Sequence, residues 1–394
     1  MSCPLTNGFK DVDCFTTDCE LDRPWTRHWP PQPGSPLYHW LQEELPEVLT
    51  YEFDPERLFN QPWKAWIRQL ISKSCPAIPV STHDTALNSE DEQKAEPSNS
   101  RVQEEREREA RVMCIVEKIK SLGLRKFRMP KLDYLADHPL LSVRKPFRSV
   151  LPFLDKLKND YVQHQASHDV PVYDVTGFED HFKLADSGFA FTKVPVNISE
   201  WTDECIHQIY LPLMEAYLRE HFGSSFVHIF SYNFRCEDKT RQPRQPWLSP
   251  LTYVHSDFTK ASSVTNLKLL LPDRADEILQ SRHRYIGIWR PLTAPHQDCP
   301  LAVCDYGSVS TSDLIKEDLV FPHYCHESYQ FKSSPHHQWF FKRAMGVDDV
   351  IIMKLFDSEA SESQFCPHSA FLDPTVPAGT PNRASIEIRA IVVG

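Results

Sequence analysis

The chain has 394 residues, a net charge of −11 and 41% hydrophobic residues, so it is globular and long enough to bury a sizeable core. The negative charge argues against a nucleic-acid partner, because binding of phosphate groups requires a basic surface. Only 11 glycines stand against 32 prolines, which argues against glycine-rich loops for phosphates or dinucleotides. The 11 cysteines include no C-x-x-C pair, and we expect free thiols in a reducing compartment.

Residues 1–130 are predicted to form an N-terminal helical extension. Short helices are expected at 36–45 and 61–73, where the sequence is rich in tryptophan and proline. Residues 76–101 are polar and cannot bury enough apolar surface to offset the entropy lost on ordering, so a flexible loop is predicted there. Apolar residues at helical spacing then predict a helix over 102–122.

The remaining domain is predicted at 131–394, and most of its sequence has a pattern typical of β-strands. Apolar residues spaced three and four apart predict a helix at 199–222, kinked by Pro212, and a second helix is expected at 266–281. Short stretches rich in Val, Ile, Phe, Tyr and Trp predict strands with few helices between them. This order indicates a mainly β barrel or sandwich and not a doubly wound sheet. The predicted strands are 225–235, 251–258, 284–290, 300–305, 326–331, 337–342, 348–356 and 384–393.

Two His-x-Asp triplets could contribute metal ligands. His255 and Asp257 lie in a strand-like stretch, where residues two apart point to the same face, so an imidazole and a carboxylate converge. His296 and Asp298 lie in a proline-bounded loop with no fixed face. We favour the first pair on this geometric ground.

A third ligand from a distant strand would complete a set of two histidines and one carboxylate, the facial triad that leaves positions open on Fe(II). The candidate is His368, so the predicted metal ligands and catalytic residues are His255, Asp257 and His368. Arg383 and Ser385 head the last predicted strand and share one of its faces. A guanidinium binds a carboxylate through two parallel hydrogen bonds, and a hydroxyl adds another, which suits the distal carboxylate of 2-oxoglutarate.

This ordered set resembles the signature of the Fe(II)/2-oxoglutarate-dependent oxygenases, which have the double-stranded β-helix (jelly-roll) fold. The segments 172–194, 288–292, 300–305, 337–341 and 366–371 resemble motifs of one fungal and bacterial branch of these enzymes. That branch contains gibberellin desaturase, the aspergillic-acid pathway hydroxylase and the cephamycin methoxylation protein. The resemblance covers roughly 170–394 and implies a jelly-roll barrel with flanking helices.

The resemblance implies Fe(II), the co-substrate 2-oxoglutarate and O2 as the reacting partners. Iron would lie on the three predicted ligands, and 2-oxoglutarate on Arg383 and Ser385. Arg290, in the Trp-Arg-Pro-Leu motif, is a further candidate that would point into the barrel and meet a carboxylate of substrate or co-substrate. Arg389 shares the strand face of Arg383, and a pair with Glu387 is as good an interpretation as a functional role.

The expected activity is hydroxylation, desaturation or oxidative cyclisation at a C–H bond of a small specialised metabolite or an amino-acid-derived substrate. Two alternatives stay open at this stage: a non-catalytic jelly-roll binding module, and an Fe(II) enzyme that does not use 2-oxoglutarate. The N-terminus lacks a signal-peptide pattern and no run of 18 apolar residues occurs, so we expect a cytoplasmic protein without a membrane partner. The sequence leaves the oligomeric state open.

Overall fold

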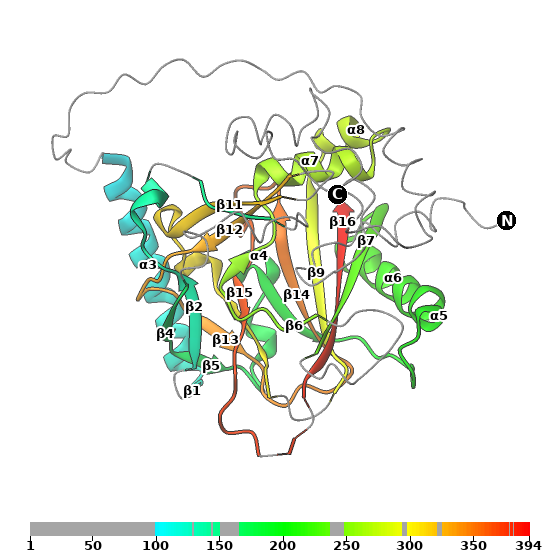
Figure 1. Ribbon diagram of the computed structural model, residues 1–394, viewed down its shortest axis with the longest axis horizontal. Coiled ribbons are helices and arrows are strands. Elements are labelled where there is room, and N and C mark those ends of the chain that lie inside the picture. The colour runs from blue at the N-terminus through cyan, green and yellow to red at the C-terminus, as the bar shows by residue number, and fades with distance from the viewer. Residues whose placement is uncertain are drawn as a thin grey trace, which may run out of the picture.

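The computed structural model (Figure 1) describes residues 99–127, 130–142, 145–149, 165–236, 248–293, 298–320, 325–377, 379–380 and 382–394. Strands dominate, and two large sheets form the body of the protein. Nine strands make the first sheet, in the order β1 (Arg125–Phe127), β5 (Val172–Asp174), β13 (Trp339–Phe341), β10 (Leu301–Cys304), β15 (His368–Ala370), β8 (His255–Ser256), β12 (Cys325–Phe331), β11 (Leu314–Val320) and β3 (Phe147–Ser149).

The second sheet has five strands and is antiparallel throughout. Its order is β6 (Phe189–Lys193), β14 (Asp349–Asp357), β9 (His283–Pro291), β16 (Ala384–Val393) and β7 (Phe226–Cys236). A small antiparallel pair, β2 (Lys131–Leu135) and β4 (Gln165–Asp169), stands beside them. Because β16 is the last of these strands in sequence yet lies between β7 and β9, the second sheet is complete only after β16 has been added.

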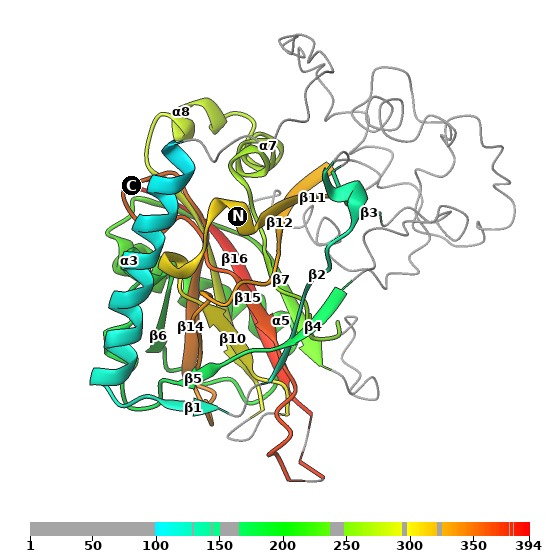
Figure 2. The same cartoon turned by 90° about the vertical axis from the view of Figure 1, so that its left-hand side faces the viewer.

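Helices cover the outside of the sheets. The helices described are α3 (Asn99–Ser121), α4 (Leu184–Ser187), α5 (Asp203–Cys205), α6 (Leu211–Phe222), α7 (Lys260–Leu270) and α8 (Ala275–Leu279). Figure 2 shows α3 running along one side of the sheets, where Ile115 and Ile119 pack into the main hydrophobic core. None of the helices in these residues combines the length and apolar character that a membrane span requires.

Both faces of the five-stranded sheet are buried, and they have different partners. On the outer face, Ile286 and Ile288 of β9 pack with Met214 and Leu218 of α6. On the inner face, Tyr285 and Trp289 of β9 join the core shared with the nine-stranded sheet. Burial of these apolar side chains on two sides of one sheet supplies much of the driving force for folding.

The inner space between the sheets has an apolar half and a polar half. Apolar side chains fill the half next to β14 and β9, including Trp289, Val303 and Met353. Polar and charged side chains line the half next to β16 and β7, where Glu387 and Arg389 are both buried. Buried polar groups of this kind require partners, so the polar half is the part of the interior suited to a binding or catalytic site.

The helix predicted at 102–122 is confirmed by α3, which begins a few residues earlier. The helix predicted at 199–222 is present as α5, a π-helical turn (Ile206–Tyr210) and α6, and the π turn ends two residues before Pro212. The single helix predicted at 266–281 is wrong, because Pro272 separates α7 from α8 and prevents a continuous helix.

Most of the predicted strands are present, with β7, β9, β10, β12, β13, β14 and β16 at their expected places. The strand predicted at 251–258 is reduced to the two residues of β8. The predicted strands do not include β1 to β6, β11 or β15. The helices expected at 36–45 and 61–73 and nearly all of the loop expected at 76–101 lie outside the described residues.

Candidate active site

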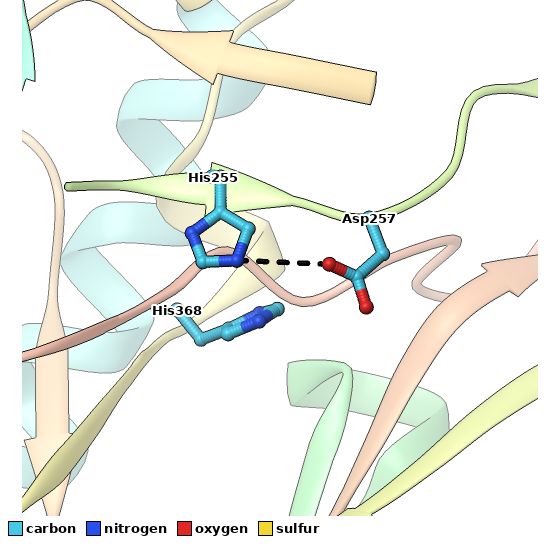
Figure 3. A group of neighbouring side chains, drawn as sticks. All are labelled: His255, Asp257 and His368. Atoms are coloured by element: carbon cyan, nitrogen blue, oxygen red, sulfur yellow. Dashed lines mark ion pairs between the residues drawn. The ribbon is translucent and has the colours of Figure 1, made fainter. Parts of the chain in front are cut away.

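Three side chains meet at the point where β8 and β15 pair. His255 of β8 and His368 of β15 are directly opposite each other in the antiparallel ladder, and their ring centroids are 4.3 Å apart. Asp257 follows β8, and its Oδ1 lies 3.6 Å from Nε2 of His255. Figure 3 shows the three side chains turned toward one another, and their ligand atoms all lie within 4.8 Å of each other.

Each imidazole is held by a carbonyl two residues before it. Nδ1 of His255 lies 2.9 Å from the carbonyl oxygen of Tyr253, and Nδ1 of His368 lies 3.0 Å from that of Cys366. A carbonyl can only accept, so Nδ1 carries the proton in both rings and Nε2 presents its lone pair. Hydrogen bonds of this kind fix the tautomer and the ring orientation of metal-binding histidines.

The charge of the cluster also suits a cation. Burial lowers the pKa of His255 well below its usual value, and the neighbouring His368 lowers it further, so the imidazole is neutral. Burial raises the pKa of Asp257, but Arg389 and the two imidazoles outweigh this and hold that pKa below its usual value. Two imidazoles and one carboxylate are the donor set of a facial-triad Fe(II) site, so the residues present fit this metal.

Two residues orient Asp257 from the other side. Nε of Arg389, on the inner face of β16, donates to Oδ2 of Asp257 at 2.8 Å, and Nη2 of Arg389 lies 3.4 Å from Glu387. Nε2 of His326 donates to the backbone carbonyl of Asp257 at 2.6 Å. Arg389 therefore serves both of the interpretations left open by the sequence, because it pairs with Glu387 and also holds a candidate metal ligand.

Arg383 and Ser385 lie on the inner face of the same strand as Arg389. Arg383 is 1% exposed, and its Nη1 donates to the carbonyl of Cys299 at 2.6 Å. Its Cζ lies over the ring of Trp289, 5.5 Å from the ring centroid. Ser385 is equally buried, and its hydroxyl has no hydrogen-bond partner among the residues that the structure describes. A buried hydroxyl without a partner is costly in a folded protein unless a bound molecule provides one.

The expectation for Arg290 is wrong. Arg290 lies on the face of β9 that carries Ile286 and Ile288, which is the outer face packed against α6. Its Nη1 and Nη2 donate to backbone carbonyls of Val347 and Val194, and its Nε donates to the hydroxyl of Tyr210. This arginine is fully buried under the helix layer and does not point into the barrel.

A second polar group beside the cluster was missed by the sequence analysis. Arg148 of β3 makes a bidentate pair with Glu317 of β11 and donates to the hydroxyl of Tyr253 at 2.6 Å. Glu317 also accepts from Gln330, the residue opposite His255 in the sheet. Only the β3–β11 pairing, which joins segments far apart in the chain, brings Arg148 here, so no local pattern could have revealed it.

The sheets and the cluster of two histidines and one carboxylate are typical of the mononuclear non-haem iron oxygenases. Residues 132–393 match the family described as "Oxidoreductase/YMDC permease-like domain", and the chain belongs to this family.

Several fungal relatives have a stated activity. The Fe(II)/2-oxoglutarate-dependent dioxygenase nvfI of Aspergillus novofumigatus is 30% identical over 241 residues, which cover 58% of this chain and 84% of the relative. The hydroxylase/desaturase poxK of Penicillium oxalicum is 25% identical over 226 residues, covering 48% of this chain and 66% of poxK. A solved structure of the iron and alpha-ketoglutarate-dependent endoperoxidase NvfI has a TM-score of 0.60 and 26% identity, over 67% of this chain and 97% of that one.

Proposed function

We propose that this protein is an Fe(II)/2-oxoglutarate-dependent oxygenase with His255, Asp257 and His368 as the iron ligands. The convergence of these three side chains, with both Nε2 atoms left as acceptors, is the observation that carries the proposal. The names of the fungal relatives support the same pair of cofactors, iron and 2-oxoglutarate. The open positions of a facial triad are those that a chelating co-substrate and O2 would use.

Arg383 and Ser385 would hold the distal carboxylate of 2-oxoglutarate. The guanidinium of Arg383 is fixed by the Cys299 carbonyl and by Trp289, so little rotamer entropy is lost when it binds a carboxylate. The partnerless hydroxyl of Ser385 supplies a further donor on the same strand face. When bound, iron with 2-oxoglutarate and O2 supplies the oxidative chemistry, and the protein orients one C–H bond of the substrate toward it.

The remaining expectations belong to this proposal. The strand order of the two sheets supports a double-stranded β-helix (jelly-roll) domain over 131–394, preceded by an extension over 1–130. The branch with gibberellin desaturase and the cephamycin methoxylation protein stays the proposed one. The substrate would be a small specialised metabolite, because the relatives include a hydroxylase/desaturase and an endoperoxidase. Hydroxylation, desaturation and cyclisation are the candidate outcomes, and a cytoplasmic location stays a prediction.

The test is formation of succinate from 2-oxoglutarate with Fe(II), ascorbate and O2. We expect slow succinate formation without added substrate, and loss of it in Asp257→Asn and His368→Ala. A folded protein that neither binds Fe(II) nor forms succinate would refute the proposal in favour of a non-catalytic binding module. Fe(II) binding without any response to 2-oxoglutarate would instead favour an iron enzyme that uses another co-substrate.

A further inference from the structure

The polar half of the interior is a paired wall on β7 and β16. In the ladder between these strands, Ser231 is opposite Arg389, Asn233 is opposite Glu387, and Arg235 is opposite Ser385. Residues directly opposite in an antiparallel pair point to the same face, so all six share the inner face with Arg389, which reaches Asp257. The wall therefore faces the candidate metal site.

Several polar atoms of this wall lack partners within the described part of the chain. These atoms are buried and have no hydrogen bond: the hydroxyl oxygens of Ser231 and Ser385, and Nδ2 of Asn233. Folded proteins rarely leave so many adjacent polar atoms unpaired. Beyond the co-substrate, this wall is suited to a ligand that forms hydrogen bonds.

The charges of the same interior do not balance. Among the residues that the structure describes, four arginines face it, against three carboxylates, and each of these carboxylates pairs with an arginine. The arginines are Arg148, Arg235, Arg383 and Arg389. Glu317 pairs with Arg148, while Asp257 and Glu387 both pair with Arg389. The charges of Fe(II) and of the 2-oxoglutarate dianion cancel each other, and Arg383 would hold the latter. Among the described residues one positive charge is then left over, and with Arg383 assigned to 2-oxoglutarate, Arg235 is the arginine of this set that forms no ion pair with a described carboxylate.

Arg235 has no ion pair with any carboxylate that the structure describes, although it is only 7% exposed. Its Nη1 donates to the carbonyl of Ser249 at 2.9 Å, which anchors one side of the guanidinium. Burial lowers the pKa of Arg235, Glu387 raises it, and Arg389 lowers it, so the charge lies within reach of the wall. A buried guanidinium that forms no close ion pair with a described carboxylate is unfavourable, and an anionic ligand bound to it would reduce this penalty.

We infer that the primary substrate carries a carboxylate and that Arg235 binds it, opposite Ser385 on the wall that faces the candidate metal site. This inference rests on the proposed function and narrows the substrate class to organic acids. Arg235 takes the role of substrate recognition that the sequence analysis had considered for Arg290. The hydrogen-bonding atoms of Asn233 and Ser231 would lie along the same acid.

The test compares acids with their primary amides on the anaerobic protein loaded with Fe(II) and saturating 2-oxoglutarate. The probes are acetate, benzoate and 2-naphthoate against acetamide, benzamide and 2-naphthamide, and affinity is measured by calorimetry. We expect at least one acid to bind about tenfold or more tightly than its amide, as for a buried charge pair. Arg235→Gln should abolish this preference and Arg235→Lys should retain part of it, with 2-oxoglutarate affinity unchanged.

The matched control is Arg219→Gln on the exposed surface of α6, where the arginine pairs with Glu215 and the acid preference should stay as in the wild type. The inference is overturned if the wild type prefers no acid of any size, if the preference survives in Arg235→Gln, or if the acids compete with 2-oxoglutarate. It is also overturned if Arg235→Gln weakens 2-oxoglutarate binding about tenfold, because the residue then serves the co-substrate. Failure of the wild type to bind 2-oxoglutarate would refute the proposed function itself, before any acid is added.

Discussion

Replacement of Arg383 by methionine gives the most direct measure of the proposed co-substrate site. Methionine replaces the apolar stem of the arginine side chain and removes the charged guanidinium. Truncating one partner of a buried, hydrogen-bonded charge pair costs about 2–5 kcal/mol, and 1.4 kcal/mol is tenfold in an equilibrium constant, so the KM for 2-oxoglutarate should rise by about 30-fold to several thousandfold. The position is 1% exposed, which places the effect in the upper part of this range.

The variant also removes the donor to the Cys299 carbonyl, which costs about 1–3 kcal/mol of folding stability. Urea unfolding therefore accompanies the kinetics, which follow succinate against 2-oxoglutarate concentration. We expect kcat at saturation to fall much less than kcat/KM, because the metal-chelating end of the co-substrate is unchanged. Arg383→Lys should recover part of the affinity, and Arg219→Met serves as the surface control. A folded Arg383→Met protein whose KM stays within about twofold of the wild type would refute the assignment, because no charge pair would then have been lost.

Three further predictions concern the metal, the backbone and pH. Fe(II) at 100 times its Kd should stabilise the folded wild type by about 2.7 kcal/mol, and His368→Ala should lose this gain. Thermal unfolding with and without EDTA measures it, and an undiminished gain in the variant would contradict the ligand assignment. Gly188 has φ 85°, and substitution by alanine would place Cβ 2.6 Å from the carbonyl oxygen of Phe365. The free energy of unfolding in urea should therefore fall by about 1–3 kcal/mol in Gly188→Ala, and a variant as stable as the wild type would disprove the clash. Hydrogen bonds from Arg282 lower the pKa of Glu362 to about 2, so the contribution of Glu362 to stability is present above about pH 4.5 and is lost as the pH falls toward 2. The free energy of unfolding, measured from pH 5 to 2, should fall less in Glu362→Gln than in the wild type, and parallel curves would contradict this.

Local patterns predicted the longer elements well. The helical spacing of α3 and the β-rich runs of β9 and β16 are visible in the sequence because each element is long enough to repeat its pattern. Strand β15 has only three residues and β8 only two, and they exist because they pair with each other and with neighbours far away in the chain. Such pairing is decided by tertiary contacts and leaves no local signal.

The same limit explains which site residues could be predicted. The spacing of two that joined His255 to Asp257 needs no knowledge of the fold, and the structure brings both to His368. For Arg290 the question was which face of β9 looks inward. All nine residues of β9 are buried, so the strand shows no alternation between polar and apolar positions from which the inner face could be read.

The carbonyls that orient the two candidate ligands have a consequence for how the site tolerates change. Tyr253 and Cys366 act on the imidazoles through main-chain oxygens, which every amino acid possesses. Substitutions at these two positions can therefore alter the surrounding packing while each histidine keeps its orienting acceptor. A relative with different side chains at these two positions would still present both imidazole rings in the same tautomer. Substitutions there therefore need no accompanying substitution of the two histidines.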